Sequence, residues 1–279
     1  MKNDIEGFKK SQLSQNKSEL TIKSYEYDLK DFLRFLDLKA DYEKIEKIPH
    51  EEMQLLINRY INKIKQILKP KTINRRCVAI NKYLKYLNID CRAKSVKIQK
   101  KLFLNNVVTK NDVRKLLNVC SNKRDRAIII TLFGSGLRVS ELLKLTVKDI
   151  NKEEIIIHGK HDKYRQVLIP IEVRIALTEY IKIRPKISED QLFIGKRGPI
   201  KRNTVNMILN KYAKKAKVKK QKVHPHSFRH LFCKNLADNG IGIDVIADLA
   251  GHTNVATTAI YTQRSKNELQ SVLDSTFTI

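Results

Sequence analysis

Apolar residues return at helical spacing along most of this chain, and this periodicity limits the folds that it can adopt. In the first third they recur every three or four positions over residues 22–36, 50–67 and 71–87, which is the pattern of helices with one buried face. Only 9 Gly and 6 Pro occur in 279 residues, so few positions would interrupt a long helix. We therefore predict that residues 1–88 form a small, all-helical domain.

The predicted helices of this domain have identifiable ends and faces. Thr21 is placed to cap the first helix, and Pro70 precedes the third. On the third helix we expect Ile73, Val78, Ile80 and Tyr83 to face the core, and Arg75, Arg76 and Lys82 to face outward. The tyrosines and leucines of the domain are interpreted as core.

The rest of the chain predicts a second, mostly helical domain over residues 107–264. Thr109 and Asp112 resemble a capping box, and we expect helices near 110–120, 124–134, 171–183, 202–216, 227–238, 242–249 and 255–262. Two short β-rich runs, Glu153–His158 and Tyr164–Ile169, predict an antiparallel hairpin with a polar turn. Residues 265–279 form a final amphipathic segment.

Between the two domains, residues 89–106 lack periodicity and carry five Lys or Arg before Leu102. We predict a linker here. Sequence leaves open whether this linker neutralises phosphates as it crosses a nucleic acid or is simply solvated.

The chain is strongly basic, with 56 Lys and Arg against 29 Asp and Glu and a net charge of +27. The excess is +10 in residues 1–100 (23 basic, 13 acidic) and +17 in residues 101–279 (33 basic, 16 acidic). Such a charge repels itself without a polyanion, so it favours a nucleic acid partner for both halves. A lysine-rich solvated surface is the alternative. The candidate nucleic acid contacts are Arg75, Arg76, Lys82, Lys163, Lys201 and Arg202.

Cysteine usage and hydropathy indicate a compartment. The four cysteines form no C-x-x-C pair, which is typical of reduced thiols inside the cell. No apolar run approaches 18 residues, and the N-terminus has no apolar signal core. We expect a soluble cytoplasmic protein that associates with the nucleoid and not with a membrane.

The second domain carries an ordered set of residues suited to phosphoryl chemistry. Arg138 follows Gly134-Ser-Gly-Leu, where the glycines permit a tight turn and Arg138 is expected in the first turn of the next helix. Its guanidinium offers a planar fork to two phosphate oxygens, and Glu141 is spaced to orient it. Lys160, near Lys163 in the hairpin turn, is placed to protonate a leaving alkoxide.

Two further motifs complete the set. His226 and Arg229 share one face of a helix that begins at Pro225, so an imidazole and a guanidinium can act together. Gly251 fits a helix C-cap that exposes His252, and Tyr261 follows nine residues later. A phenol is a weak nucleophile that needs cationic neighbours, which these residues would supply. A metal site is the rival reading, since His226, His230 and Cys233 have ligand-like spacings.

The spaced set Arg138, Glu141, Lys160, His226, Arg229, His252 and Tyr261 resembles that of the tyrosine recombinases, the phage integrase family. The resemblance covers residues 106–265 strongly and the helical first domain more weakly. It implies a mainly α fold in which a core-binding domain and a mostly helical catalytic domain, with a small antiparallel sheet, clamp duplex DNA.

The resemblance also implies a site-specific recombinase that needs neither metal, ATP nor any other cofactor. Arg138 and Arg229 would bind the scissile phosphate and Tyr261 would form a 3′-phosphotyrosyl link. Lys160 would be the general acid, His226 would assist proton transfer, His252 would hydrogen-bond the transition state, and Glu141 would support them. Four protomers on paired inverted-repeat sites would exchange strands through a Holliday junction, with residues 265–279 docking on a neighbouring protomer. A second recombinase or a DNA-bending protein would be a further partner.

The chain departs from the family pattern in small ways. His161 follows Lys160 where many members have Gly, and an N-terminal arm-binding domain is absent from the sequence, which favours a simple resolvase, integrase or Xer-type protein. A serine recombinase or a metal-dependent transposase does not explain the ordered set. A type IB topoisomerase-like enzyme and a DNA-binding clamp without catalysis stay open as alternatives.

Overall fold

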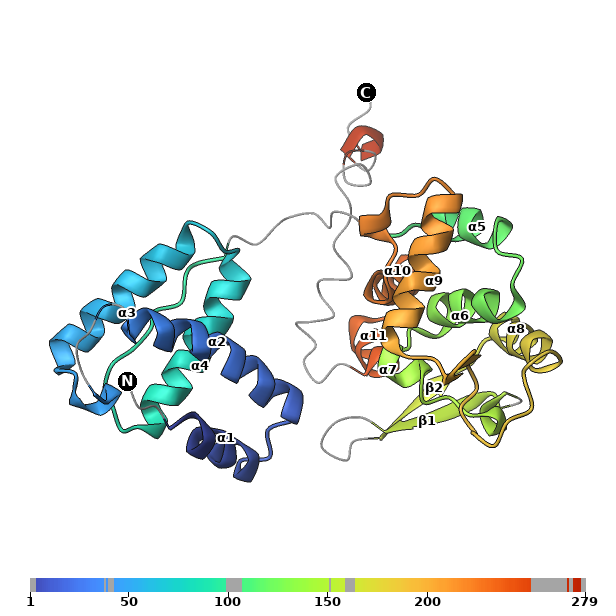
Figure 1. Cartoon of the computed structure of the whole chain (residues 1–279). Helices are drawn as coiled ribbons and strands as arrows, with labels where there is room; N and C mark the ends of the chain where they lie inside the picture. Colours follow the sequence, from blue (N-terminus) through green and yellow to red (C-terminus); the bar gives the residue numbers. More distant parts are fainter. Residues whose placement is uncertain are drawn as a thin grey trace. The chain divides into compact units, whose positions relative to one another are not determined.

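The computed structural model describes residues 4–37, 39, 43–98, 107–150, 152–158, 164–251, 270 and 273–276. The chain divides into two compact units, Met1–Lys100 and Lys101–Ile279, which are drawn in Figure 1 and are called here the first and second unit. None of the helices over the described residues is long and apolar enough to span a membrane.

The first unit is all-helical, as predicted. Its helices are α1 (Ile5–Ser14), α2 (Glu19–Asp37), α3 (His50–Lys65) and α4 (Pro70–Tyr86), with a short 3-10 turn, η1 (Ile45–Lys47). Helix α1 was not predicted from the sequence. Its Phe8 is fully buried and meets the ring of Tyr83 on α4 edge-on at 5.3 Å between centroids, and its N-cap Asp4 accepts the Tyr86 hydroxyl of the same helix.

Three predictions about the ends and faces of these helices are wrong. Helix α2 begins at Glu19, and the Ser18 hydroxyl accepts the Thr21 backbone N–H at 3.3 Å, so Ser18 and not Thr21 is the cap. Val78 on α4 is 46% exposed instead of buried. Arg76, expected outward, is only 8% exposed. The other three residues expected inward on α4 are at most 2% exposed, so the buried face is predicted correctly and only these two residues are misplaced.

Arg76 belongs to a buried polar cluster between α2, α3 and α4. Its guanidinium donates to the Tyr60 hydroxyl at 2.7 Å and pairs with Asp31. Asp28, fully buried, accepts from Arg75 at 2.8 Å. Burial raises the pKa of Asp28 against the opposing charges of Arg75 and Arg76. Arg76 therefore ties the helices together, and its assignment as a nucleic acid contact is corrected.

The predicted linker begins later than expected, because residues 89–98 pack on the first unit. Ala93 is 1% exposed within the apolar core. The Asn81 side-chain amide bonds both backbone groups of Ala93, at 2.8 and 3.0 Å, and the Asn74 amide does the same for Val96. Gln54 pairs likewise with Arg92. Three amide side chains thus make the hydrogen bonds that a neighbouring β-strand would make to this segment, which has no regular secondary structure.

The second unit combines helices with two small β-ladders (Figure 1). Its elements are α5 (Lys110–Asn118), α6 (Lys123–Ser135), α7 (Val139–Leu142), η2 (Val147–Asp149), β1 (Glu154–His158), β2 (Tyr164–Leu168), α8 (Ile171–Ile181), β3 (Ile194–Gly195), β4 (Gly198–Pro199), α9 (Arg202–Lys215), η3 (Lys220–Lys222), α10 (Pro225–Asp238) and α11 (Ile243–Ala250). The predicted helices within the described residues are confirmed to within a few positions, and Thr109 forms the expected capping box with Asp112. The β3–β4 ladder was not predicted. The helix expected at 255–262 lies outside the described residues.

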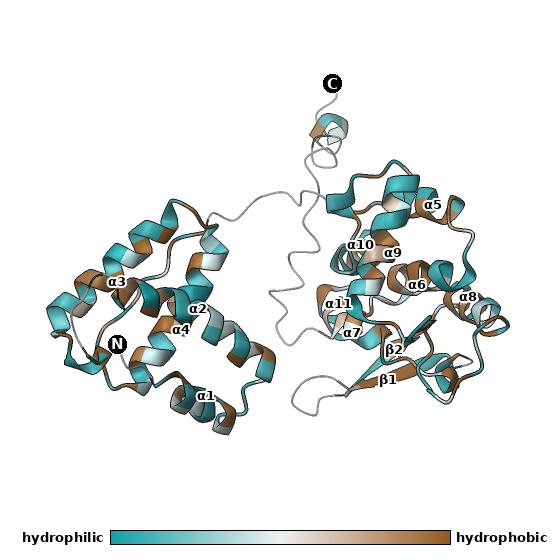
Figure 2. Ribbon diagram, in the orientation of Figure 1, coloured by the Kyte–Doolittle hydropathy of each residue, from teal (hydrophilic) through white to brown (hydrophobic). Residues whose placement is uncertain are grey.

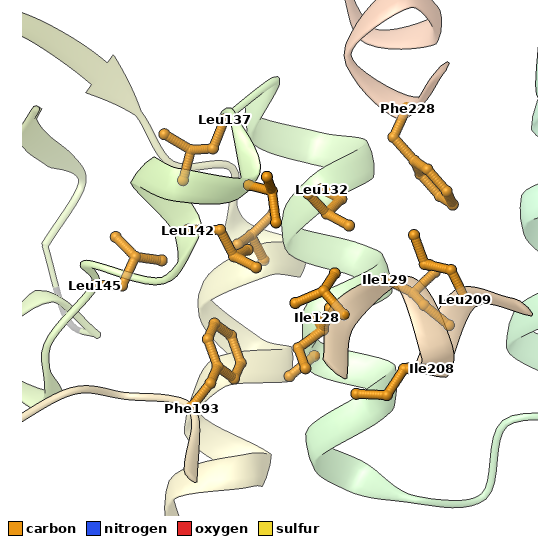
Figure 3. Packing of buried hydrophobic residues seen from close by; sticks show 14 of the residues in the cluster. Ile128, Ile129, Leu132, Leu137, Leu142, Leu145, Phe193, Ile208, Leu209 and Phe228 are labelled. Atoms are coloured by element: carbon orange, nitrogen blue, oxygen red, sulfur yellow. The ribbon is translucent and has the colours of Figure 1, made fainter. Parts of the chain in front are cut away.

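Helix α6 is the centre of the second unit and contacts α5, α7, α8, α9 and α10. Its residues Ile128, Ile129 and Leu132 are fully buried. Figure 3 shows them among Leu142 of α7, Leu209 of α9 and Phe228 of α10. Apolar faces likewise gather inside each unit in Figure 2. A central helix packed against five others fixes the loop at its C-terminal end, from which the candidate site begins.

The β1–β2 hairpin is antiparallel as predicted, with Ile155 opposite Val167 and Ile157 opposite Arg165. These four residues share one face because side chains alternate along a strand. Ile155, Ile157 and Val167 are at most 5% exposed, whereas Ile156 and Leu168 on the other face are 58% and 61% exposed. Arg165 therefore occupies an inward position on an otherwise apolar face. The turn of the hairpin, residues 159–163, lies outside the described residues.

Candidate functional site

The turn between α6 and α7 positions Arg138. Helix α6 ends at Ser135, and its C-cap Gly136 adopts a left-handed conformation with φ 60°. An added Cβ at Gly136 would meet the Phe232 ring. Glycine satisfies both constraints. Leu137 is then fully buried, and Arg138 becomes the N-cap residue of α7 with an exposed side chain. Arg138 thus precedes the first helical turn in which it was expected.

Glu141 holds Arg138 from one helical turn further on. One carboxylate oxygen accepts the Arg138 guanidinium at 2.8 Å, and the other accepts the Arg138 backbone N–H at 2.7 Å. The second oxygen also accepts Arg165 at 2.8 Å. Burial alone would raise the pKa of Glu141, but these hydrogen bonds and the two positive charges outweigh it, and the pKa lies below its ordinary value.

Helix α10 positions the next two residues, as its motif predicted. The His224 ring caps the helix by accepting the Ser227 N–H at 3.1 Å, and Pro225 is the first helical residue. Arg229, one turn later, is 2% exposed and donates to the Gly136 carbonyl at 2.8 Å. Helices α6 and α10 are therefore joined at the turn that leads to Arg138.

His226 lies on the same helix face and has an exposed side chain. Loss of water on its packed side and the positive charges of Arg229 and Arg138 lower the pKa of this imidazole below 6.5. Its ring meets that of His230 edge-on, with 4.5 Å between centroids. A neutral imidazole near two guanidiniums can accept a proton from a nucleophile.

Three arginines meet the C-terminal end of α11, where Gly251 adopts the predicted left-handed cap with φ 64°. Arg165 donates to the Leu249 carbonyl, Arg229 to the Ala250 carbonyl, and Arg138 to the Gly251 carbonyl at 2.8 Å. The last carbonyls of a helix have no partner within it and carry partial negative charge. We call this arrangement the arginine clasp.

The described residues thus bring Arg138, Glu141, His226 and Arg229 into one part of the second unit, as the motifs predicted. Lys160, Lys163, His252 and Tyr261 lie outside the described residues, so their roles stay predictions. Sequence reasoning missed Arg165. The available signal was strand alternation, since a cation on the inward face of a hairpin must have a buried partner.

Exposure separates the remaining candidate nucleic acid contacts. Lys201 and Arg202, at the start of α9, are exposed. Lys82 is half-buried, and the Arg75 side chain is 49% exposed while paired with Asp28. Contact of these four residues with nucleic acid stays a prediction, whereas Arg76 is buried between helices of the first unit.

The metal interpretation gains no support within the described part of the chain, where no group of three His, Cys, Asp or Glu residues could hold an ion. Cys233 is fully buried in a small cluster with Ile246 and Ala250, and burial raises the pKa of its thiol to about 11. A thiol with that pKa is a poor ligand near neutral pH.

Comparison with known proteins decides the family. Residues 106–268 match the model of the phage integrase family, and residues 5–89 match the phage integrase N-terminal SAM-like domain. The chain belongs to the phage integrase family. It is 34% identical to tyrosine recombinase XerC of Thermodesulfovibrio yellowstonii, over 94% of this chain and 91% of that protein.

Other members of this family match along most of the chain. The TnP I resolvase of Bacillus thuringiensis is 28% identical over 93% of this chain and 95% of the resolvase. A crystal structure of the XerH site-specific recombinase, bound to a palindromic difH substrate after cleavage, superposes with a TM-score of 0.74 at 21% identity. That superposition covers 93% of this chain and 81% of XerH. The fold is that of a two-domain recombinase, and this family member is a tyrosine recombinase.

Proposed function

We propose that this phage integrase family member cleaves and rejoins duplex DNA at specific sites through a 3′-phosphotyrosyl intermediate. The observation that supports the proposal is the placement of Arg138 and Arg229. Their guanidiniums donate to the consecutive carbonyls of Gly251 and Ala250, directly before the segment that carries His252 and Tyr261. Two phosphate-binding groups and the nucleophile are therefore linked through one short stretch of backbone.

In the proposed first step, the Arg138 and Arg229 guanidiniums bind the two non-bridging oxygens of the scissile phosphate. A planar fork suits this role because it donates to two oxygens and keeps its charge at any physiological pH. The Arg138 side chain is 43% exposed, so it is accessible to DNA. Glu141 limits its rotation, which lowers the entropy that binding would cost.

In the chemical step, the Tyr261 oxygen attacks phosphorus and the bond to the 5′ oxygen breaks. His226 accepts the phenolic proton, and Lys160 donates a proton to the leaving 5′ oxygen. His252 hydrogen-bonds the transition state. The phosphotyrosyl ester replaces the phosphodiester, so the reverse attack by a 5′ hydroxyl rejoins the strand without a nucleotide cofactor or a metal ion.

The partners follow from this chemistry and from the relatives. We propose that four protomers pair two inverted-repeat sites and exchange strands through a Holliday junction, and that residues 265–279 dock on a neighbouring protomer. The relatives are named XerC and TnP I resolvase. These names support one of two roles: resolution of replicon dimers, or cointegrate resolution, integration or excision for a mobile element. The protein would act at the nucleoid, alone or with a second recombinase or a DNA-bending protein.

Covalent trapping tests the proposal. Wild type and Tyr261→Phe are incubated with DNA that flanks the gene, with chelator present, and quenched in detergent. DNA attached to wild type only, at inverted repeats, is the expected result. Adducts with Tyr261→Phe would remove the nucleophile assignment, and binding without adducts by wild type would favour the non-catalytic clamp. Relaxation of a plasmid without exchange between two sites would favour a topoisomerase-like enzyme.

A further inference from the structure

We propose that Arg165, the buried strand member of the arginine clasp, is a positioning residue that fixes the Arg138 guanidinium for the scissile phosphate. The inference rests on the proposed function, since it assigns how one phosphate-binding side chain of that site is held. Its support is a closed circuit of hydrogen bonds among groups from three separate elements.

The circuit runs through β2, α7 and the end of α11. Arg165 on β2 donates to the Glu141 carboxylate at 2.8 Å and to the Leu249 carbonyl. Glu141 accepts Arg138 at 2.8 Å, and Arg138 donates to the Gly251 carbonyl at 2.8 Å. Leu249 and Gly251 are two residues apart at the end of one helix. Each member is therefore held by two neighbours, and the orientation of Arg138 depends on all of them.

The hydrogen bonds of the Arg165 guanidinium are made to groups of the protein. Its side chain is 13% exposed, and its two terminal nitrogens are both engaged, one by a carboxylate and one by a carbonyl. Both terminal nitrogens of Arg138 are also bonded, to Glu141 and to the Gly251 carbonyl, and the difference between the two arginines is that the Arg138 side chain is 43% exposed. Arg165 is thus the buried support and Arg138 the group that can reach a phosphate.

The positive charge of Arg165 also stabilises the buried Glu141 carboxylate. The second carboxylate oxygen accepts the Arg138 backbone and Arg165, so loss of Arg165 removes one of the two cations from a buried carboxylate. Glu141 would then pair more closely with Arg138 and draw it away from the phosphate. A lysine at position 165 keeps the charge but cannot bridge a carboxylate and a carbonyl with a planar fork.

The test compares Arg165→Lys with Arg124→Lys in the full-length protein. Arg124 is a matched control because it also bridges a carboxylate, Asp125 at 2.8 Å, and a carbonyl, Ile194 at 3.0 Å, with a side chain 25% exposed. Arg124 has no part in the proposed site. Single-turnover formation of the covalent complex is measured on a trapped duplex site whose scissile group is either the normal phosphodiester or a methylphosphonate.

The methylphosphonate lacks the negative charge that the guanidiniums hold, so a defect that acts through Arg138 should shrink on it. We expect Arg165→Lys to be slower than wild type by about tenfold or more on the phosphodiester and by less than about threefold on the methylphosphonate. Arg138→Lys should show the same selectivity. Arg124→Lys should stay within about twofold of wild type on both substrates.

An equal loss on the two substrates, or no loss, would overturn the proposal, because a purely structural defect lowers both rates alike. Partial misfolding cancels in the ratio of the two rates. Should Arg165→Lys fail to fold, Glu141→Gln, which leaves Arg165 in place and removes the shared charge, must show the same selective loss. Wild type that forms no covalent complex would instead refute the proposed function.

Discussion

At the scale of single residues, Gly251 is under two constraints, as Gly136 is. Its φ of 64° lies in the left-handed region, and an added Cβ would overlap the Arg165 side chain. Gly240 has a similar φ of 80°, but nothing lies within 4 Å of its added Cβ. Substitutions at Gly240 and Gly251 therefore distinguish the cost of backbone strain from the cost of displacing a neighbouring side chain.

We predict that Gly240→Ala lowers the free energy of unfolding by about 1 kcal/mol, from backbone strain alone. Gly251→Ala should lower it by about 2–4 kcal/mol, because Arg165 must also move. Urea unfolding of the two variants measures the difference. Equal losses would show that Arg165 does not press on Gly251.

His226 should make the stability of the DNA-free chain depend on pH. The pKa of this imidazole is lowered below 6.5 in the folded chain, so the unfolded chain takes up the proton first as the pH falls. The free energy of unfolding should therefore decrease as the pH falls below about 6.5 and be unaffected above it. His226→Gln should weaken this dependence in urea unfolding between about pH 7.5 and 5.5. An unchanged dependence would contradict the lowered pKa.

At the scale of elements, the segment over residues 89–98 is held by side chains and not by a β-ladder. Asn81 both donates to the Ala93 carbonyl and accepts its N–H, a pairing that only an amide can make. Asn81 on α4 thus takes the place of the backbone of a neighbouring strand.

Asn81→Asp replaces the donating NH2 by a second oxygen and leaves the Ala93 carbonyl facing a negative charge. We predict a loss of about 1–3 kcal/mol in the free energy of unfolding of the first unit. The control is Asn62→Asp, an exposed position on α3 whose oxygen accepts from Lys65 at 3.3 Å and which should change stability by less than about 0.5 kcal/mol. Similar losses in both variants would argue against the amide pairing.

At the scale of the whole molecule, charge is the dominant property. Seven lysines stand between positions 211 and 222, immediately before His224 and the helix that carries His226 and Arg229. Lys215, Lys217 and Lys219 are exposed. A basic approach to the site would attract the DNA backbone without reading its sequence.

We predict that the triple change of Lys215, Lys217 and Lys219 to Ala reduces the slope of log K against log salt by about 1–3 units. The control changes Lys148, Lys182 and Lys186, which are also exposed, to Ala; this equal loss of charge should alter the slope by less than about one unit. Binding of duplex DNA is measured over a range of salt. Equal slopes for the two variants would show that the run is an ordinary solvated surface.

Sequence predicted most helices because apolar spacing is a local signal, and it predicted Arg138, His226 and Arg229 because short motifs carry them. It misplaced Arg76 because an arginine is buried only where other helices supply its partners, here Tyr60 of α3 and Asp31 of α2. It missed α1 because the two buried residues of that helix, Phe8 and Gln12, include one apolar side chain, too few for a periodic signal. Arg165 was missed because its acceptors are a carboxylate 24 residues away and a carbonyl 84 residues away.

The arginine clasp has a consequence for how variation in this chain should be interpreted. Its acceptors at positions 249, 250 and 251 are carbonyls, which every amino acid possesses. Mutational drift can therefore replace Leu249 or Ala250 without deleting a partner of Arg165 or Arg229. A single substitution can remove one arginine donor. The three carbonyl acceptors are lost only if the backbone at the end of α11 adopts another conformation. A scan that substitutes side chains would thus detect the arginines and, apart from Gly251, would overlook the carbonyls that they hold.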